Sequence, residues 1–397
     1  MANRISAERH AAMRWRGLSG FLGVAMSAVI ALGLTFGLPS RVAASDNLLH
    51  YAGGAVVTGA PKVYLIFWGS GWGMRTFNAN GDMTFSNDLY GGAPRLQEMY
   101  KGLGTNGELW SGVMTQYCQG VALSATVCPN SSAHVAYPDG HALAGVYYDN
   151  QPVPINATKQ QIGGEAVTMA ELFGNSPNAQ FVIASPPGSR PEGFPSQATG
   201  CARHDDASAS FGTVVYTNLP YVMDLGVQCG MGVVNGGGPA GYLDGYTFAA
   251  SHEFAESITD PILSWGWGQP GSGAEAGDMC LPPLDGFGPS QPVNVRFSTG
   301  TFAMTALWSN DTNTCETAHS ILPVRVLVPN LVGETVAQAK QVLLAHGLVL
   351  GSTSSHVDCN NLGLVTSQNP LAGNLVLAGT AVNITVGTKP SPPAVCS

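Results

Sequence analysis

Two short apolar runs bounded by turn residues stand out in the first half of the chain. Residues 63–68 are Val-Tyr-Leu-Ile-Phe-Trp and end at Gly-Ser-Gly, and residues 181–184 are Phe-Val-Ile-Ala and end at Ser-Pro-Pro-Gly. A continuous apolar run of this length predicts a strand that is buried on both faces. Between the two runs, residues 158–173 have helical spacing that is interrupted by Gly163-Gly164. The order strand, helix, strand predicts an α/β core.

Three further segments complete this pattern. Residues 214–217, Val-Val-Tyr-Thr, form another candidate strand. Residues 246–259 are predicted to be a helix that ends before Asp260-Pro261, because proline disfavours helical backbone at the residue before it. The glycine-rich residues 266–273 are predicted to be a loop.

The pattern changes after Cys315, and residues 325–388 predict a small separate module. Thr335 and Gln338 have the spacing of a helix capping box, and Gly347 stands where a glycine ends a helix. The apolar stripe of this helix consists of Val336, Ala339, Val342 and Leu343. Val382, Ile384 and Val386 alternate as one face of a final strand. A Pro-rich tail, residues 389–397, follows.

This C-terminal module resembles a PASTA domain. The resemblance rests on the opening Val-Pro-Asn-Leu-Val-Gly at 328–333, on Gly347-Leu348, on Gln-Asn-Pro at 368–370 with Ala372-Gly373, and on the closing strand. It implies a β-α-β-β fold and an extracellular bacterial module that is associated with recognition of peptidoglycan or the cell wall. The chain has one copy of the module, so a simple stalk without affinity for the wall is the alternative.

The first 44 residues have the composition of an export signal. Four arginines precede an apolar run at 17–38, and Val42-Ala43-Ala44 supplies the small residues at which a signal peptidase cuts. The run is nearly long enough to span a membrane, so an uncleaved N-terminal anchor is the alternative. Either interpretation places residues 45–397 outside the cytoplasm.

All eight cysteines follow that segment, and an even number in an exported chain favours disulfides. Pairing of sequence neighbours is the simplest connectivity, but the sequence leaves other pairings open. The neighbour pairs are 118–128, 201–229, 280–315 and 359–396.

Residues 252–260, at the end of the predicted helix, pack a histidine and three carboxylates into nine residues of a chain that is only 10% charged overall. His252 and Glu256 are four residues apart, so a helix presents them on one face, as two ligands of one divalent metal. Glu253 then stands where the general base of a zinc hydrolase stands. A zinc-protease motif has a second histidine in place of Glu256, so the motif is a variant. A solvated charged helix face is the alternative.

Two ligands do not hold a catalytic metal, and a third must come from elsewhere. The candidates are Asp278, Glu275 and His204, of which we favour the two carboxylates; Asp260, near the helix end, is the weakest. Zn²⁺ is the expected ion. The carboxylate-rich set also suits Ca²⁺ or Mn²⁺, and a structural ion is an alternative to a catalytic one.

Residues 60–320 also resemble the phosphate-induced protein 1 family, whose plant members are called EXORDIUM, most strongly over 200–280. The resemblance rests on the block Gly-Cys-Ala-Arg-His-Asp-Asp at 200–206, on the His-Glu-x-x-Glu helix with Asp260-Pro261, and on Glu275, Asp278 and Cys280. It implies a shared fold without a firmly implied activity. For the main domain, residues 45–320, we expect a metallopeptidase-like, or zincin-like, α/β fold.

Two functional hypotheses remain open. The first is a secreted metal-dependent hydrolase that acts on peptide or protein and is held at the wall by its last domain. The second is a non-catalytic surface protein whose acidic helix holds a structural ion or none. A net charge of −9 argues against a nucleic-acid partner. The absence of a Gly-x-Ser-x-Gly sequence argues against a serine hydrolase.

Overall fold

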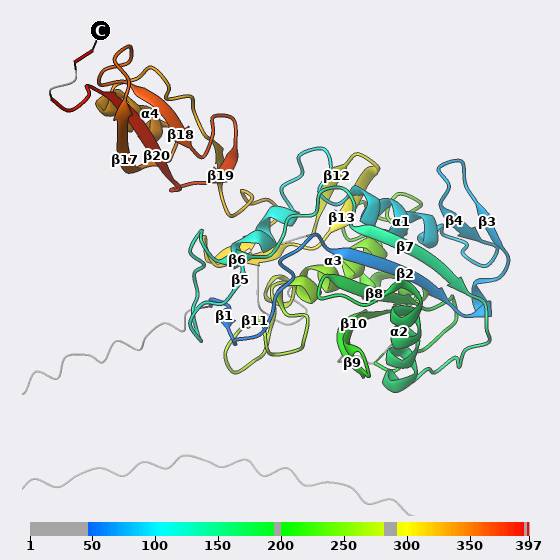
Figure 1. The fold of residues 1–397 in the computed structure, drawn as a ribbon. Helices are drawn as coiled ribbons and strands as arrows, with labels where there is room; N and C mark the ends of the chain where they lie inside the picture. Colours follow the sequence, from blue (N-terminus) through cyan, green and yellow to red (C-terminus); the bar gives the residue numbers. More distant parts are fainter. Residues whose placement is uncertain (1–46, 194–199, 282–291, 393–394, 397) are drawn as a thin grey trace, which may run out of the picture. The chain divides into compact units, whose positions relative to one another are not determined.

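The computed structural model describes residues 47–193, 200–281, 292–392 and 395–396 (Figure 1). The predicted signal or anchor, residues 1–44, lies outside these residues. Within the described part of the chain, no helix combines the length and apolarity needed to cross a membrane.

A five-stranded sheet forms the centre of the main domain. Its strand order is β7 (Leu143–Asp149), β2 (Lys62–Trp68), β8 (Ala179–Ala184), β10 (Gly212–Leu219) and β9 (Arg203–Ala209). The first four strands are parallel, and the edge strand β9 is antiparallel to β10. The α/β prediction and the three predicted strands are confirmed. The sequence analysis did not predict β7 and β9.

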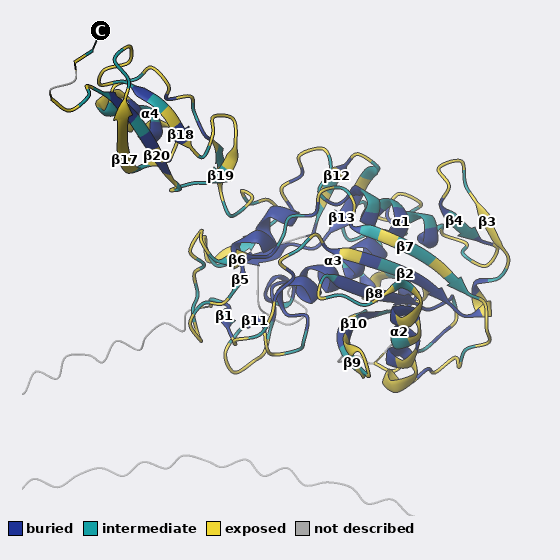
Figure 2. Cartoon of the chain, in the orientation of Figure 1, coloured by how far each residue is buried: buried dark blue, intermediate teal, exposed yellow. Residues whose placement is uncertain are grey.

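Alternate side chains of the buried strands enter two different cores, one on each face of the sheet. Val63, Leu65 and Phe67 of β2 join the larger core with helices α1 (Gly92–Gly102) and α3 (Asp244–Thr259). Ile66 and Trp68 join the smaller core with helix α2 (Lys159–Phe173). The helices therefore cover both faces, and Figure 2 shows the central strand β8 and helix α3 as mostly buried.

Helix α2 runs through Gly163-Gly164 without a break, so the predicted interruption is wrong. A Cβ on Gly163 would lie 3.3 Å from Ala207 Cβ and 3.4 Å from Tyr216 Cε1. The missing side chain lets the helix approach β9 and β10 closely. At its start, Thr158 and Gln161 form a reciprocal capping box that explains where the helix begins.

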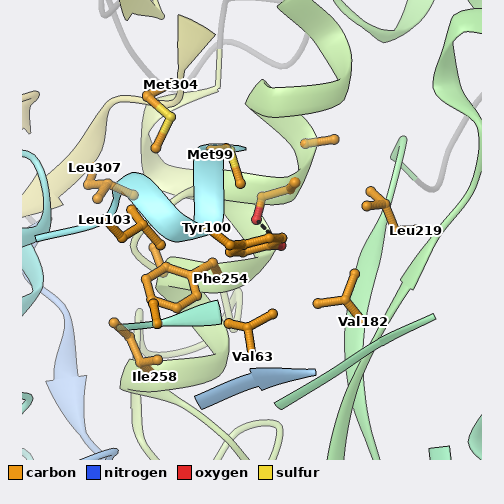
Figure 3. Packing of buried hydrophobic residues seen from close by; sticks show 14 of the residues in the cluster. Val63, Met99, Tyr100, Leu103, Val182, Leu219, Phe254, Ile258, Met304 and Leu307 are labelled. Atoms are coloured by element: carbon orange, nitrogen blue, oxygen red, sulfur yellow. Dashed lines mark hydrogen bonds between the residues drawn. The ribbon is translucent and has the colours of Figure 1, made fainter. Parts of the chain in front are cut away.

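Helix α1 was not predicted, because no residue at its first position marks a cap. The carboxylate of Asp88, four residues before Gly92, accepts the backbone N–H groups of Gly92 and Ala93 instead. Tyr100 of α1 packs against Phe254 of α3 with ring centroids 6.1 Å apart (Figure 3). This contact places the apolar side of α3 in the core.

Short elements complete the main domain. The predicted loop at 266–273 contains a two-residue strand, β11 (Trp267–Gly268), which pairs with β1 (His50–Tyr51) because the backbone there meets the N-terminal segment. The other two-stranded pairs are β3 (Arg75–Phe77) with β4 (Met83–Phe85), β5 (Cys118–Gln119) with β6 (Ala133–His134), β12 (Val293–Phe297) with β13 (Gly300–Met304), and β14 (Leu307–Ser309) with β15 (Thr314–Glu316). The 3-10 helices are η1 (Ser70–Trp72), η2 (Ser111–Gln116), η3 (Val222–Cys229) and η4 (Asp278–Cys280).

The C-terminal module has its own apolar core. It consists of β16 (Arg325–Leu327), α4 (Val336–Ala345), β17 (Val349–Val357), β18 (Val365–Asn369), β19 (Leu375–Leu377) and β20 (Ala381–Thr388). The predicted capping box, the helix-ending Gly347 at φ +68°, and the buried alternation of β20 are confirmed. The predicted β-α-β-β order omits two strands, because β16 and β19 are only three residues long and pair with each other.

All four predicted disulfides are confirmed, each joining neighbours in the sequence. Cys201–Cys229 joins the chain just before β9 to the end of η3, and Cys280–Cys315 holds the end of η4.

Candidate metal centre

Helix α3 buries the His-Glu-x-x-Glu motif completely. His252, Glu253 and Glu256 are 8%, 5% and 3% exposed, so the alternative of a solvated charged face is wrong. His252 Nε2 lies 3.1 Å from Glu256 Oε1, as the spacing of one helical turn predicts. The opposite side of the same helix carries Phe254 into the apolar core. Packing of that side therefore fixes the direction in which the polar side points.

Residues 275–278, which we call the acidic strap, lie across this part of the helix. Asp278 Oδ1 is 3.4 Å from His252 Nε2, and the Asp278 backbone N–H donates to Glu256 Oε1 at 3.1 Å. A Cβ on Gly277 would lie 2.6 Å from His252 Nδ1, so only glycine lets the strap come this close. Cys280, bonded to Cys315, ties down the end of the strap.

His204 approaches the same carboxylates from the edge strand β9. Its Nδ1 lies 3.4 Å from Glu253 Oε2 and 3.6 Å from Glu256 Oε2, and its Nε2 lies 3.5 Å from Glu275 Oε1. Its backbone N–H also donates to Glu253 Oε2 at 2.6 Å. His204 is only 2% exposed. The His204 Nε2 also lies 3.2 Å from the backbone oxygen of Asp260.

The structure brings the four predicted ligands together, but their carboxylates lie beside two different imidazoles, those of His252 and His204. Asp278 lies beside His252, whereas Glu275 lies beside His204, and Glu256 faces both. Asp260 is not part of the cluster's donor set. Its carboxylate oxygens accept the backbone N–H groups of the loop after the helix, at Ser264, Trp265 and Gly266.

Carboxylates hold both imidazoles in their charged form. Burial alone would lower the pKa of His204, but hydrogen bonds to Glu253 and Glu256 and the charge of Glu275 raise it well above the ordinary value. Burial would likewise lower the pKa of His252, and Glu256 and Asp278 raise it. These neighbouring imidazoles outweigh burial and lower the pKa of Glu256. Burial and the charge of Glu256 raise the pKa of Glu275 to about 10.

The donor set fits a divalent metal. Two groups have ligand atoms within 4.8 Å of one another, namely His204 with Glu256 and Glu275, and His252 with Glu253 and Glu256. Two buried atoms, His252 Nδ1 and Glu275 Oε1, have no hydrogen-bond partner among the residues that the structure describes. Nitrogen and carboxylate donors in this combination suit Zn²⁺ or Mn²⁺. The bound cation would take over the role of the protons that the cluster carries without metal.

Comparison with known proteins identifies the C-terminal module. Residues 326–388 match the PASTA domain, as the sequence analysis predicted. None of the curated proteins matches the chain. The PASTA domain and the four disulfides indicate an extracellular or cell-wall location. The chain thus combines an α/β main domain with a C-terminal PASTA domain, and the PASTA domain suggests an association with the cell wall.

Proposed function

We propose that this protein is an exported, wall-associated metal-dependent hydrolase whose main domain is zincin-like and acts on peptide or protein. The observation that carries this proposal is the burial of His252, Glu253 and Glu256 on one helix, with further donors converging on them. In an interior of low polarity, such a charged cluster is costly unless a cation or protons neutralise it. The resemblance to the phosphate-induced protein 1 family is part of the proposal for the fold.

Four of the predicted residues have defined roles in this proposal. His252 and Glu256 hold the ion, and Asp278 beside them is the third ligand. The ion, when bound, supplies Lewis acidity and a more acidic water. Glu253 accepts the proton of the attacking water with one carboxylate oxygen while the other, Oε2, stays bonded to the His204 backbone N–H. That bond orients the carboxylate and keeps it next to the edge strand.

The substitution Glu253→Gln tests this assignment. The amide oxygen of Gln still accepts the His204 N–H, so the fold and the bound metal should remain, while the proton acceptor is lost. We expect hydrolysis of unstructured protein and peptide substrates to fall by at least about a hundredfold. Glu171→Gln, on the exposed side of α2, is the matched control. Unchanged hydrolysis in Glu253→Gln, or less than about half an equivalent of tightly bound metal in the wild type, contradicts the proposal.

A structural role for the ion is the second candidate. The bond from the His204 backbone to Glu253 favours it, because a carboxylate used as a strand-to-helix tie is already engaged. In that case metal removal should lower the melting temperature, and no substrate should be cleaved.

We also propose that the PASTA domain binds peptidoglycan. A chain that ends at residue 320 should lose sedimentation with purified cell walls and keep its metal content, because the module has a separate core. Equal sedimentation of both chains would indicate that the module is only a stalk.

A further inference from the structure

Glu256 presents its two carboxylate oxygens to two different imidazoles. Its Oε1 lies 3.1 Å from His252 Nε2, and its Oε2 lies 3.6 Å from His204 Nδ1. The two histidines are 48 residues apart in the sequence and come from different elements, α3 and β9. A carboxylate between two separate nitrogen donors has the arrangement of a bridging ligand.

Each imidazole also has a second carboxylate of its own. Asp278 Oδ1 lies 3.4 Å from His252 Nε2, and Glu275 Oε1 lies 3.5 Å from His204 Nε2. Both acids come from the acidic strap, so a single short segment supplies one donor to each side of Glu256. Glu275 Oε1 is buried and has no hydrogen-bond partner within the described part of the chain, as expected for an atom that a ligand is to engage.

Two cations would balance the charge of the cluster without protons. When metal-bound, the imidazoles are neutral, and Glu253, Glu256, Glu275 and Asp278 are four negative charges in one largely buried cluster. Two divalent ions balance these four charges, whereas one ion leaves the His204 side of the cluster to be balanced by protons. Asp260 directs its carboxylate oxygens to three backbone N–H groups of the following loop and not to the cluster.

From these contacts we infer that the cluster is a binuclear metal centre in which Glu256 bridges two divalent transition-metal ions. One ion has His252, Glu256 and Asp278 as protein ligands, and the other has His204, Glu256 and Glu275. The inference rests on the metal-dependent function proposed above and extends it. Paired ions at about 3.5–4 Å stabilise both the attacking and the leaving atoms of a hydrolysed bond. The amide bond of a peptide therefore remains the substrate class that such a centre fits.

Metal stoichiometry tests the inference without relying on activity. The full chain, stripped with a chelator and reloaded with Mn²⁺ alone, should bind two equivalents and give the exchange-coupled electron paramagnetic resonance spectrum of a Mn²⁺ pair. His204→Ala should bind one equivalent and give the spectrum of an isolated ion. Asp278→Asn should also weaken one of the two sites, by about 10–100-fold. His141→Ala, whose imidazole is 86% exposed, is the matched control and should bind two equivalents.

Each other outcome overturns the inference in a recognisable way. One equivalent in the wild type, lost on substitution of His252 but kept in His204→Ala, refutes the pair and leaves the proposed hydrolase standing. No bound metal in the wild type refutes both. Two equivalents that persist uncoupled in His204→Ala and in Asp278→Asn would place the second ion elsewhere. Asp278 has a side chain that is 40% exposed, so its variant remains informative if His204→Ala does not fold.

Discussion

Gly277 is the position at which the candidate centre should be most sensitive to one added methyl group. Its backbone, at φ −76° and ψ −44°, is open to alanine, so Gly277→Ala carries no conformational penalty. The added Cβ would lie 2.6 Å from His252 Nδ1, 2.8 Å from Cε1 and 2.9 Å from Glu256 Oε1, whereas ordinary contact begins at 3.4 Å. Either the imidazole or the acidic strap must therefore move by about 0.8 Å.

Both movements damage the same site. A displaced imidazole separates His252 from Glu256, and a displaced strap carries Asp278 away from both. We expect metal binding to weaken by about 10–100-fold, which is the usual effect of disturbing the groups that orient metal ligands. Overpacking should lower the free energy of unfolding by only about 1–3 kcal/mol. Competition with a chromophoric chelator measures the affinity, and thermal unfolding of the metal-free protein measures the stability.

Gly237→Ala is the matched control, because Gly237 has open space around it and no left-handed backbone. It should leave the metal affinity and the free energy of unfolding unchanged. The reasoning is refuted if Gly277→Ala folds and binds metal as tightly as the wild type. It is equally refuted if Gly237→Ala weakens binding to the same degree.

Three other predictions concern the stability of the main domain. Every tryptophan of residues 47–397 lies in this domain, so indole fluorescence reports its unfolding. Burial and the charge of Asp149 raise the pKa of Glu165 from 4.5 to about 7, so wild-type stability should fall as pH rises from 4.5 through 7. Glu165→Gln should remove this pH dependence and raise the free energy of unfolding by about 2 kcal/mol at pH 8. An unchanged pH dependence in urea titrations would contradict this. Phe254→Ala should lower the free energy of unfolding by about 3–5 kcal/mol in the same titration. A loss below about 1 kcal/mol would mean that the Phe254 side chain is not packed in the core. Joint replacement of Cys280 and Cys315 by serine should lower the free energy of unfolding by about 2–4 kcal/mol and weaken metal binding. Metal affinity equal to that of the wild type in chelator competition would show that the disulfide does not anchor the acidic strap.

Local signals in the sequence were sufficient for many elements. Strands β2 and β8 are continuous apolar runs closed by turn residues, and both occur where that pattern predicts them. Helices α2 and α4 begin at Thr158 and Thr335, whose capping boxes are complete within four residues of sequence. Cysteine pairing also followed sequence order. The strand and cap signals depend on residues that are near in the chain, whereas the disulfides join cysteines that are 10 to 37 residues apart.

The edge strand β9 shows where local signals end. Its first residues, Arg203, His204, Asp205 and Asp206, are polar and do not have the pattern of a strand. Pairing with β10 makes the segment a strand, and that pairing is formed with residues 212–218. The sequence analysis therefore kept His204 only as a minor candidate ligand. The signal available in the sequence was a histidine three residues after a cysteine, in a chain with few charges.

The sequence by itself determined that one turn of helix α3 presents His252 and Glu256 together, because helical geometry alone places residues four apart on one face. It also determined the PASTA module, whose turns and caps are local. Only the tertiary structure decided that Asp278 lies beside His252 and that Glu275 lies beside His204. Those positions depend on how the sheet, the helix and the acidic strap pack against one another, and packing between distant segments leaves no periodic trace in the sequence.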